Sequence, residues 1–214
     1  MGKTETVITS RLALVAWGIA GCVCLQLDQA IQPIITSLGD VAIVRTAAFF
    51  WNEIGATWGI VMFLVAGLAL SPHDRGATAI RFAVCVSLAG AIVQIMKHLV
   101  GRVRPASLDG MTYFYGPLAW FRVDSDMRID SMPSGHTAAA FAMATALSFR
   151  WPSLSRLWYA AATGVGVCRT LTNSHFLSDV VLGALLGTVV SIVAYRQCDS
   201  WCGLLRRGRG PAVR

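Results

Sequence analysis

Long apolar stretches alternate with short polar ones along most of the chain. Six apolar stretches stand out, at residues 12–27, 55–70, 79–96, 135–149, 157–168 and 180–195. Most of them can be extended toward the roughly 20 residues that a membrane-spanning helix needs. The pattern therefore predicts an all-α, polytopic membrane protein with six transmembrane helices in a bundle.

Composition supports this prediction. Of the 214 residues, 55% are hydrophobic and only 14% are charged, and the mean hydropathy is +0.60. Soluble domains usually carry about 25% charged residues. There is no internal repeat or low-complexity linker, so we expect a single domain over residues 1–214. The first apolar stretch follows a basic start but lacks a small-x-small cleavage site, which favours an uncleaved anchor helix over a signal peptide.

The basic residues predict an orientation. With six spans, both termini lie on one side, and 11 of the 18 Lys and Arg residues fall there. The other seven are Arg45, Lys97, Arg102, Arg104, Arg122, Arg128 and Arg169. The positive-inside rule then predicts cytoplasmic termini in a plasma (inner) membrane. The basic tail "LLRRGRG" is interpreted as a contact with anionic lipid of the bilayer, and no nucleic-acid partner is expected.

The cysteines carry little chemistry of their own. Cys22, Cys24, Cys85 and Cys168 fall in or at the ends of apolar stretches, so no disulfide framework is expected. A metal site at Cys198 and Cys202 would need two further ligands nearby, and the sequence offers none.

Polar residues gather in three segments, all on the predicted outer side. Charged residues cost about 2.5–3.5 kcal/mol each at the centre of a spanning helix, so they indicate function unless they lie at its ends. The first segment is "KHLVGRVRPAS", where Lys97 and Arg104 are seven residues apart, about two helical turns. The alternative is a pair of basic residues that extend to the membrane surface.

The second segment, "MPSGHTAAAFAMATA", begins the fourth apolar stretch. Ser134 suits a helix N-cap, and the free N–H groups of a first turn can bind an anion. Gly135 allows a ligand to approach the backbone, and His136 lies in the first turn. The alternative is a capped helix with an incidental histidine.

The third segment, "CRTLTNSHFLSD", carries Arg169, His175 and Asp179. An aspartate one turn from a histidine can accept its Nδ1–H and leave Nε2 free to attack or to take a proton. One alternative is a structural hydrogen-bonded pair. Another is zinc bound by two histidines and a carboxylate, which the nearby cations would disfavour.

Together the three segments suggest a pocket for a tetrahedral dianion such as phosphate. Arginine binds phosphate oxygens through two donors, and lysine adds a point charge. In this interpretation His175 is an activated nucleophile and the other histidine an acid.

The three segments also match a known signature. Lysine, six residues and Arg-Pro are followed by Pro-Ser-Gly-His and by arginine, five residues, histidine, three residues and aspartate. The chain thereby resembles the type-2 phosphatidic acid phosphatase superfamily. The resemblance implies that His175 attacks phosphorus to form a phosphohistidine, that Asp179 holds its ring, and that His136 protonates the leaving oxygen. It implies phosphate binding by Lys97, Arg104, Arg169, Ser134 and Gly135, without a metal. Cys168 departs from the family pattern, which usually has serine there.

The resemblance implies an integral-membrane lipid phosphatase whose active site lies at the outer interface, facing the periplasm or exterior. Substrates of similar members include undecaprenyl diphosphate, phosphatidylglycerol phosphate, phosphatidic acid and lipid A phosphates. A lipid phosphotransferase using the same intermediate, a vanadium haloperoxidase and a non-enzymatic lipid transporter remain alternatives. The aromatic loop 111–121 either shapes the entrance or caps the bundle. Asp124, Asp126 and Asp130 behind it either discourage surplus anions or form a solvated loop.

Overall fold

The computed structural model describes residues 11–55, 61, 64, 65, 69, 75–107, 114–121 and 128–208. The α-helices in these ranges are α2 (Arg11–Gly39), α3 (Ala42–Gly55), α5 (Arg75–Val100), α6 (Gly135–Arg150), α7 (Ser155–Leu171) and α8 (Leu177–Gly208). Short 3-10 helices are η1 (Pro105–Ser107), η2 (Ala119–Phe121) and η3 (Pro152–Leu154). The prediction of an all-α protein is confirmed.

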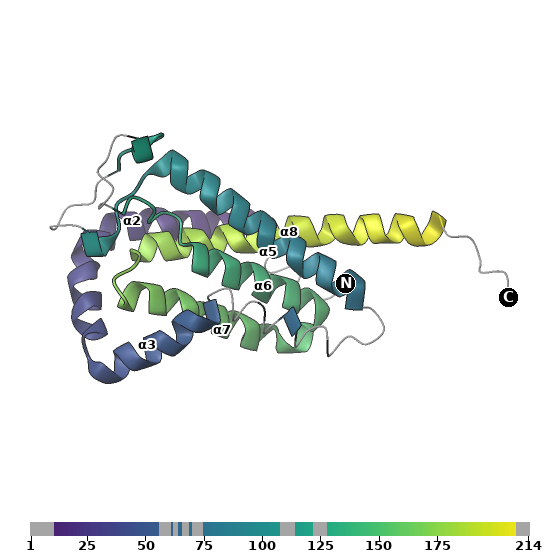
Figure 1. Ribbon diagram of the computed structural model, residues 1–214, viewed down its shortest axis with the longest axis horizontal. Coiled ribbons are helices and arrows are strands. Elements are labelled where there is room, and N and C mark those ends of the chain that lie inside the picture. The colour runs from purple at the N-terminus through teal and green to yellow at the C-terminus, as the bar shows by residue number, and fades with distance from the viewer. Residues whose placement is uncertain are drawn as a thin grey trace.

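The helices form a bundle around α6 (Figure 1). Helix α6 packs against α5, α7 and α8, while α2 lies against α8 and α3 against α7. The largest core cluster joins α5, α6 and α8 through apolar side chains that include Phe82, Met143 and Tyr195. The C-terminal part of α8 extends past the other helices (Figure 1).

Two glycines bring α6 and α8 into close contact. Gly183 and Gly187 are four residues apart and therefore lie on one face of α8. A Cβ atom at Gly183 would lie 2.6 Å from the carbonyl oxygen of Ser134, and one at Gly187 would lie 2.1 Å from that of Ala138. Small residues at this spacing are typical of helix pairs inside membranes. The contact sets the start of α6 directly beside the start of α8.

Three of the described helices are long and apolar enough to cross a membrane, namely Val15–Gly39, Arg75–Val100 and Leu177–Ser200. They embed the protein in a membrane. The stretches at 135–149 and 157–168 form α6 and α7, which have 16 and 17 residues. The stretch at 55–70 lies largely outside the described residues, so the number of six spans stays a prediction.

Two elements differ from the sequence pattern. The first apolar stretch of the sequence ends at residue 27, but α2 continues to Gly39 and Asp28 is buried inside the protein. Helix α3 had no counterpart among the predicted elements because residues 42–55 mix apolar and polar side chains. It packs along α7 and contributes side chains to the site described below.

Candidate active site

The end of α5 and the starts of α6 and α8 meet at one end of the bundle (Figure 1). Helix α5 stops at Gly101, whose φ of +57° is in the left-handed region and whose N–H bonds to the carbonyl oxygen of Lys97. A Cβ atom at Gly101 would lie 2.6 Å from the carbonyl oxygen of Gly116. Glycine therefore both ends this helix and allows the chain to turn tightly beneath the 114–121 segment.

Lys97 and Arg104 converge on one carboxylate, Asp130, and we call these three residues the rim ion cluster. Arg104 donates from Nε to Oδ1 and from Nη2 to Oδ2 of Asp130, both at 2.6 Å. Lys97 Nζ lies 3.5 Å from Oδ2. Burial alone would raise the pKa of the Asp130 carboxyl, but the Arg104 hydrogen bond and the Lys97 charge lower it to about 2. Asp130 is thus a paired anion and not part of a solvated loop.

Ser134 occupies the N-cap position of α6, as the sequence predicts. Its side chain does not cap the helix and instead accepts a hydrogen bond from Thr137 Oγ1 at 2.9 Å. Its N–H donates to the carbonyl oxygen of Asp179 at 3.0 Å, which ties α6 to α8. Gly135 faces Lys97, and a Cβ there would lie 4.0 Å from Nζ. The first N–H groups of α6, which have no partner within the helix, thus begin beside a lysine ammonium.

His175 is almost completely buried in the segment between α7 and α8. Its N–H donates to the carbonyl oxygen of Arg169 at 3.1 Å, and its side chain is 1% exposed. Nδ1 lies 3.8 Å from Asp179 Oδ2, which is too long for a hydrogen bond, and no other described residue bonds to Nδ1. Burial lowers the pKa of His175, while Asp179 acts in the opposite direction.

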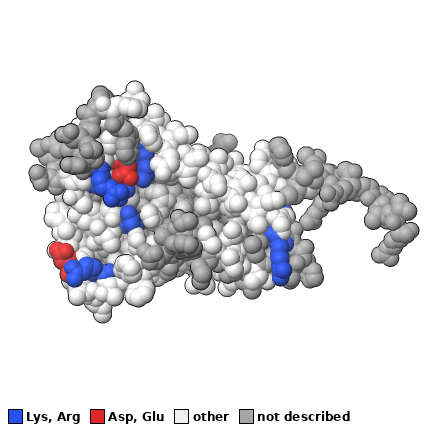
Figure 2. Space-filling view, viewed as in Figure 1, with Lys and Arg blue, Asp and Glu red and all other residues white. Residues whose placement is uncertain are grey.

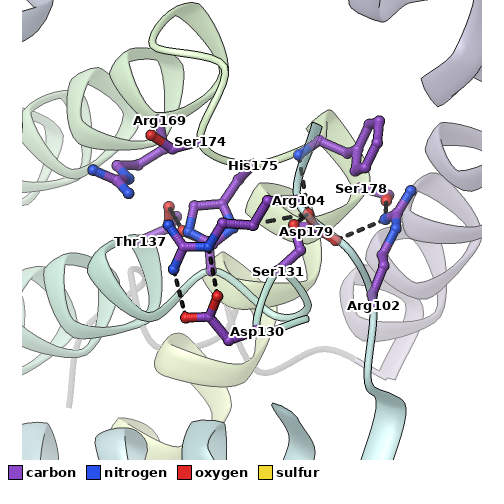
Figure 3. A network of polar contacts seen from close by, with 12 residues as sticks. Arg102, Arg104, Asp130, Ser131, Thr137, Arg169, Ser174, His175, Ser178 and Asp179 are labelled. Carbon is purple, nitrogen blue, oxygen red and sulfur yellow. Dashed lines mark hydrogen bonds and ion pairs between the residues drawn. The ribbon is translucent and has the colours of Figure 1, made fainter. Parts of the chain in front are cut away.

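Asp179 is held from the side opposite His175 by an arginine that the sequence analysis did not select. Arg102 Nη1 donates to Asp179 Oδ1 and Nη2 donates to Asp28 Oδ2, both at 2.7 Å. All three side chains are fully buried, and we call them the buried ion cluster. Figure 3 shows Arg102 and Asp179 side by side, with Ser178 between them.

Further donors complete the buried ion cluster. Asp179 Oδ2 accepts hydrogen bonds from Ser131 Oγ at 2.6 Å and from the Phe176 N–H at 2.9 Å. Asp28 Oδ1 accepts one from the Ser178 N–H at 3.1 Å. The Arg102 guanidinium stacks over the Phe176 ring at 4.1 Å. Asp179 is therefore fixed by several donors before any ligand is present.

The predicted residues of all three segments lie in one place. Arg104 and Arg169 are close enough to His175 for their charges to act on it. The charges that act on His136 are those of Lys97, Arg104, Arg169 and His175. Arg169 Nη1 donates to Asn52 Oδ1 of α3. In Figure 3 the Arg104 guanidinium overlaps the His175 ring in the view, and Arg169 lies to their upper left. Figure 2 shows basic side chains around an acidic one at this end of the molecule.

Comparison with known families identifies this arrangement. Residues 78–201 match the PAP2 superfamily, a range that contains every residue of the three segments and more than half of the chain. The chain belongs to the PAP2 superfamily. The resemblance seen in the sequence is thereby confirmed.

Curated relatives are similar over part of their length. The chain is 33% identical over 114 residues to a lipid A 1-phosphatase of Porphyromonas gingivalis, covering 51% of this chain and 21% of that protein. It is 25% identical over 116 residues to a lipid A 1-phosphatase of Rhizobium etli, covering 53% and 48%. The chain thus spans about half the length of one of these relatives and about a fifth of the other.

Two solved structures share the PAP2 fold seen here. LpxE of Aquifex aeolicus superimposes with a TM-score of 0.61 at 21% identity, covering 79% of this chain and 95% of that chain. A transmembrane PAP2-type phosphatidylglycerolphosphate phosphatase of Bacillus subtilis gives 0.58 at 19% identity, covering 87% and 96%.

Cys168, the departure from the PAP2 signature, links two helices. The Cys168 thiol is buried and donates to the Ala48 carbonyl oxygen of α3 at 2.6 Å. It therefore joins α7 to α3. None of the five described cysteines, Cys22, Cys24, Cys85, Cys168 and Cys198, is part of a disulfide bond. Within the described ranges, no three His, Cys, Asp or Glu side chains are grouped closely enough to hold a metal ion.

Residues outside the signature also surround the PAP2 site. The aromatic loop is described only in part, and Phe114 lies over the Arg102 guanidinium at 5.1 Å. Asp124 and Asp126 lie outside the described residues. An apolar groove of about 450 Å³ runs between α5 and α8 and reaches Met132 and Pro133, directly before Ser134. A polar site and an apolar groove thus adjoin at the same short segment.

Proposed function

We propose that the protein is a membrane lipid phosphatase that hydrolyses a terminal phosphate through a phosphohistidine on His175. The observation that carries this proposal is the convergence of two histidines and three cations from three distant segments. Such a set matches a phosphoryl group, whose oxygens bind cations while a neutral imidazole attacks phosphorus.

The geometry supports a division of labour within the reaction. Lys97, Arg104 and Arg169 hold the phosphoryl oxygens, together with the first N–H groups of α6 near Ser134 and Gly135. Because burial keeps His175 neutral at pH 7, its Nε2 has a free electron pair for attack on phosphorus. Closing the 3.8 Å gap between Nδ1 and Asp179 would then stabilise the positive charge that develops on the ring.

The steps balance as a double displacement. His136 acts as its imidazolium, the form that the phosphate dianion favours when it lies beside the ring. The Nε2–P bond forms as the bond between phosphorus and the lipid oxygen breaks, and the His136 imidazolium gives its proton to that oxygen. His136 then takes a proton from water as the water oxygen attacks phosphorus. Inorganic phosphate leaves and His175 returns to its neutral form. No step requires a metal ion.

The proposed substrate is a lipid because of the groove beside the site. Its lining side chains are apolar, and it reaches the backbone that leads into Ser134. An alkyl chain in this groove would leave its phosphate at the rim ion cluster. The similarity to lipid A 1-phosphatases favours a phosphorylated glycolipid over phosphatidic acid, phosphatidylglycerol phosphate or undecaprenyl diphosphate. We place the site at the outer face of an inner membrane, with cytoplasmic termini.

The test is a panel of these four lipid phosphates offered to the purified protein in detergent, scored by released phosphate. We expect release with the wild type in EDTA as in its absence, and none with His175→Ala. The loss of turnover counts for the nucleophile assignment if His175→Ala unfolds at the wild-type temperature, and normal turnover by this variant would contradict the assignment. Transfer of phosphate to a second lipid without free phosphate would instead identify a phosphotransferase.

A further inference from the structure

We propose that Asp130 is a carboxylate that competes with phosphate for the pocket, so that a bound phosphoryl group must displace it from Arg104 and Lys97. This inference rests on the proposed function, because the two cations are assigned there to phosphate. It adds a residue outside the signature segments that sets the affinity of the site.

The geometry of the rim ion cluster carries the inference. Asp130 uses both of its oxygens on the Nε and Nη2 donors of Arg104, each at 2.6 Å. This is the two-donor arrangement with which arginine also binds phosphate. The second oxygen lies 3.5 Å from Lys97 Nζ as well. In the structure a carboxylate thus occupies donors that a phosphoryl group would need.

The surroundings of Asp130 allow its side chain to leave. The backbone on either side is fixed, because the Arg104 N–H donates to Arg128 O and the Ser131 N–H donates to Arg102 O, both at 2.9 Å. The side chain itself is 19% exposed, whereas that of Asp179 is completely buried. Displacement therefore requires rotation of one side chain toward solvent and no change in the backbone.

Charge explains why such a competitor is useful. Lys97, Arg104 and Arg169 together carry three positive charges, and one carboxylate reduces this sum to two. Three unopposed cations would also retain inorganic phosphate, the product of the reaction. A tethered carboxylate is present at a high local concentration and returns to the cations as the product leaves. Since the Arg104 hydrogen bond and the Lys97 charge lower the pKa of Asp130 to about 2, the competitor is ionised at neutral pH.

The experiment compares Asp130→Asn with the wild type in detergent. Inorganic phosphate is the probe, measured both as an inhibitor of lipid phosphate hydrolysis and through the rise in unfolding temperature that it causes. Because a charge-assisted pair is replaced by a neutral one, we expect the inhibition constant of phosphate to fall about tenfold. The thermal shift at a given phosphate concentration should increase in parallel.

A matched control is available at the other end of the bundle. Asp199 pairs with Arg81 Nε at 2.8 Å, and Asp199→Asn removes the same charge without touching the pocket. This variant should bind phosphate as the wild type does. If Asp130→Asn is poorly folded, Asp130→Ala serves as the second variant. It should also bind phosphate more tightly than the wild type, and it has no amide that could bond to Arg104.

Two results would overturn the inference. Weaker phosphate binding in Asp130→Asn would mean that Asp130 holds Arg104 in position for the ligand, and unchanged binding would mean that Asp130 has no influence. The thermal shift requires no turnover. An increased shift in a protein that hydrolyses no lipid phosphate would therefore support the competition and reject the proposed function separately.

Discussion

The two ion clusters of this protein share one site but differ in their access to water. In the buried ion cluster, the side chains of Asp28, Arg102 and Asp179 are 0% exposed. In the rim ion cluster, Lys97, Arg104 and Asp130 are 9%, 11% and 19% exposed. Both clusters pair an arginine with a carboxylate at hydrogen-bonding distance, at 2.7 Å in the buried ion cluster and 2.6 Å in the rim ion cluster. The difference therefore lies in their surroundings.

The two clusters also differ in the ratio of carboxylates to cations. The buried ion cluster has two carboxylates for one guanidinium, and serine and backbone donors satisfy the remaining oxygens. The rim ion cluster has two cations for one carboxylate, with Arg169 close to it. A fully satisfied buried cluster fixes geometry, because breaking any contact leaves an unpaired charge away from water. A partly exposed cluster with surplus positive charge can exchange its carboxylate for a ligand.

The largest effect is expected from Arg102→Ala. This change leaves Asp28 and Asp179 buried without their cation, and removal of one partner of a buried pair typically costs about 3–5 kcal/mol. We expect the free energy of unfolding in detergent to fall by that amount, measured by chemical denaturation. Activity should fall too, because Asp179 would no longer be held beside His175.

Arg102→Lys provides the control for this prediction. Lysine keeps the positive charge but cannot bond to two carboxylates with a rigid fork, so we expect a smaller loss of stability than with alanine. If Arg102→Ala unfolds at the same denaturant concentration as the wild type, the buried ion cluster does not stabilise the fold. The proposed difference in role between the two clusters would then be wrong.

Arg104→Ala should lower activity strongly and stability only slightly. It removes a preorganised donor for the phosphoryl group, a loss that typically lowers rates by about 10²–10³-fold. Stability should fall less than in Arg102→Ala, since Lys97 still faces Asp130 and water reaches the pair. The two quantities to measure are kcat/KM for a lipid phosphate and the free energy of unfolding. A variant that keeps its activity but unfolds early would assign Arg104 to the scaffold.

The proximity of Lys97, Ser134 and Gly135 could be predicted from the sequence because these residues lie at helix ends. Lys97 ends an apolar stretch, and Ser134 with Gly135 begins another. In a bundle of consecutive spans, the end of one helix and the start of the next lie on the same side. Spacing within each segment then places the side chains near one another, even though the distances between helices are unknown.

The buried ion cluster could not be predicted in this way. In the sequence Asp28 follows the first apolar stretch, and Arg102 is one of seven basic residues on the predicted outer side. A carboxylate within an otherwise apolar helix does indicate that a partner exists, because its unpaired burial is costly. The partner of Asp28 is Arg102, which lies 74 positions further along the sequence. No local sequence pattern indicates a contact over that separation.

The partner of Asp130 and the helix α3 do not follow from the sequence for a related reason. For Asp130 the sequence leaves open whether it discourages surplus anions or faces water, and only the paired backbone of 102–104 and 128–131 brings it to Arg104. Helix α3 has exposed aromatic side chains, Phe49 and Phe50, so its pattern does not indicate a buried face. Both depend on neighbours that are distant in sequence.

The smallest effect expected is a dependence of stability on pH that comes from His175, beside the buried ion cluster. Because burial lowers its pKa below 6.5, the folded protein binds fewer protons at this site than the unfolded chain once the pH falls below 6.5. Stability should therefore decline as the pH falls from 7.5 to 5, with a slope of at most about 1.4 kcal/mol per pH unit for one proton. His175→Gln lacks this group, so the difference in unfolding free energy between wild type and variant should shrink over this range. A difference that grows toward low pH would show that Asp179 stabilises the protonated His175 ring more than burial destabilises it. In that case Asp179 of the buried ion cluster would have a carboxylate oxygen available to His175 even without a bound ligand.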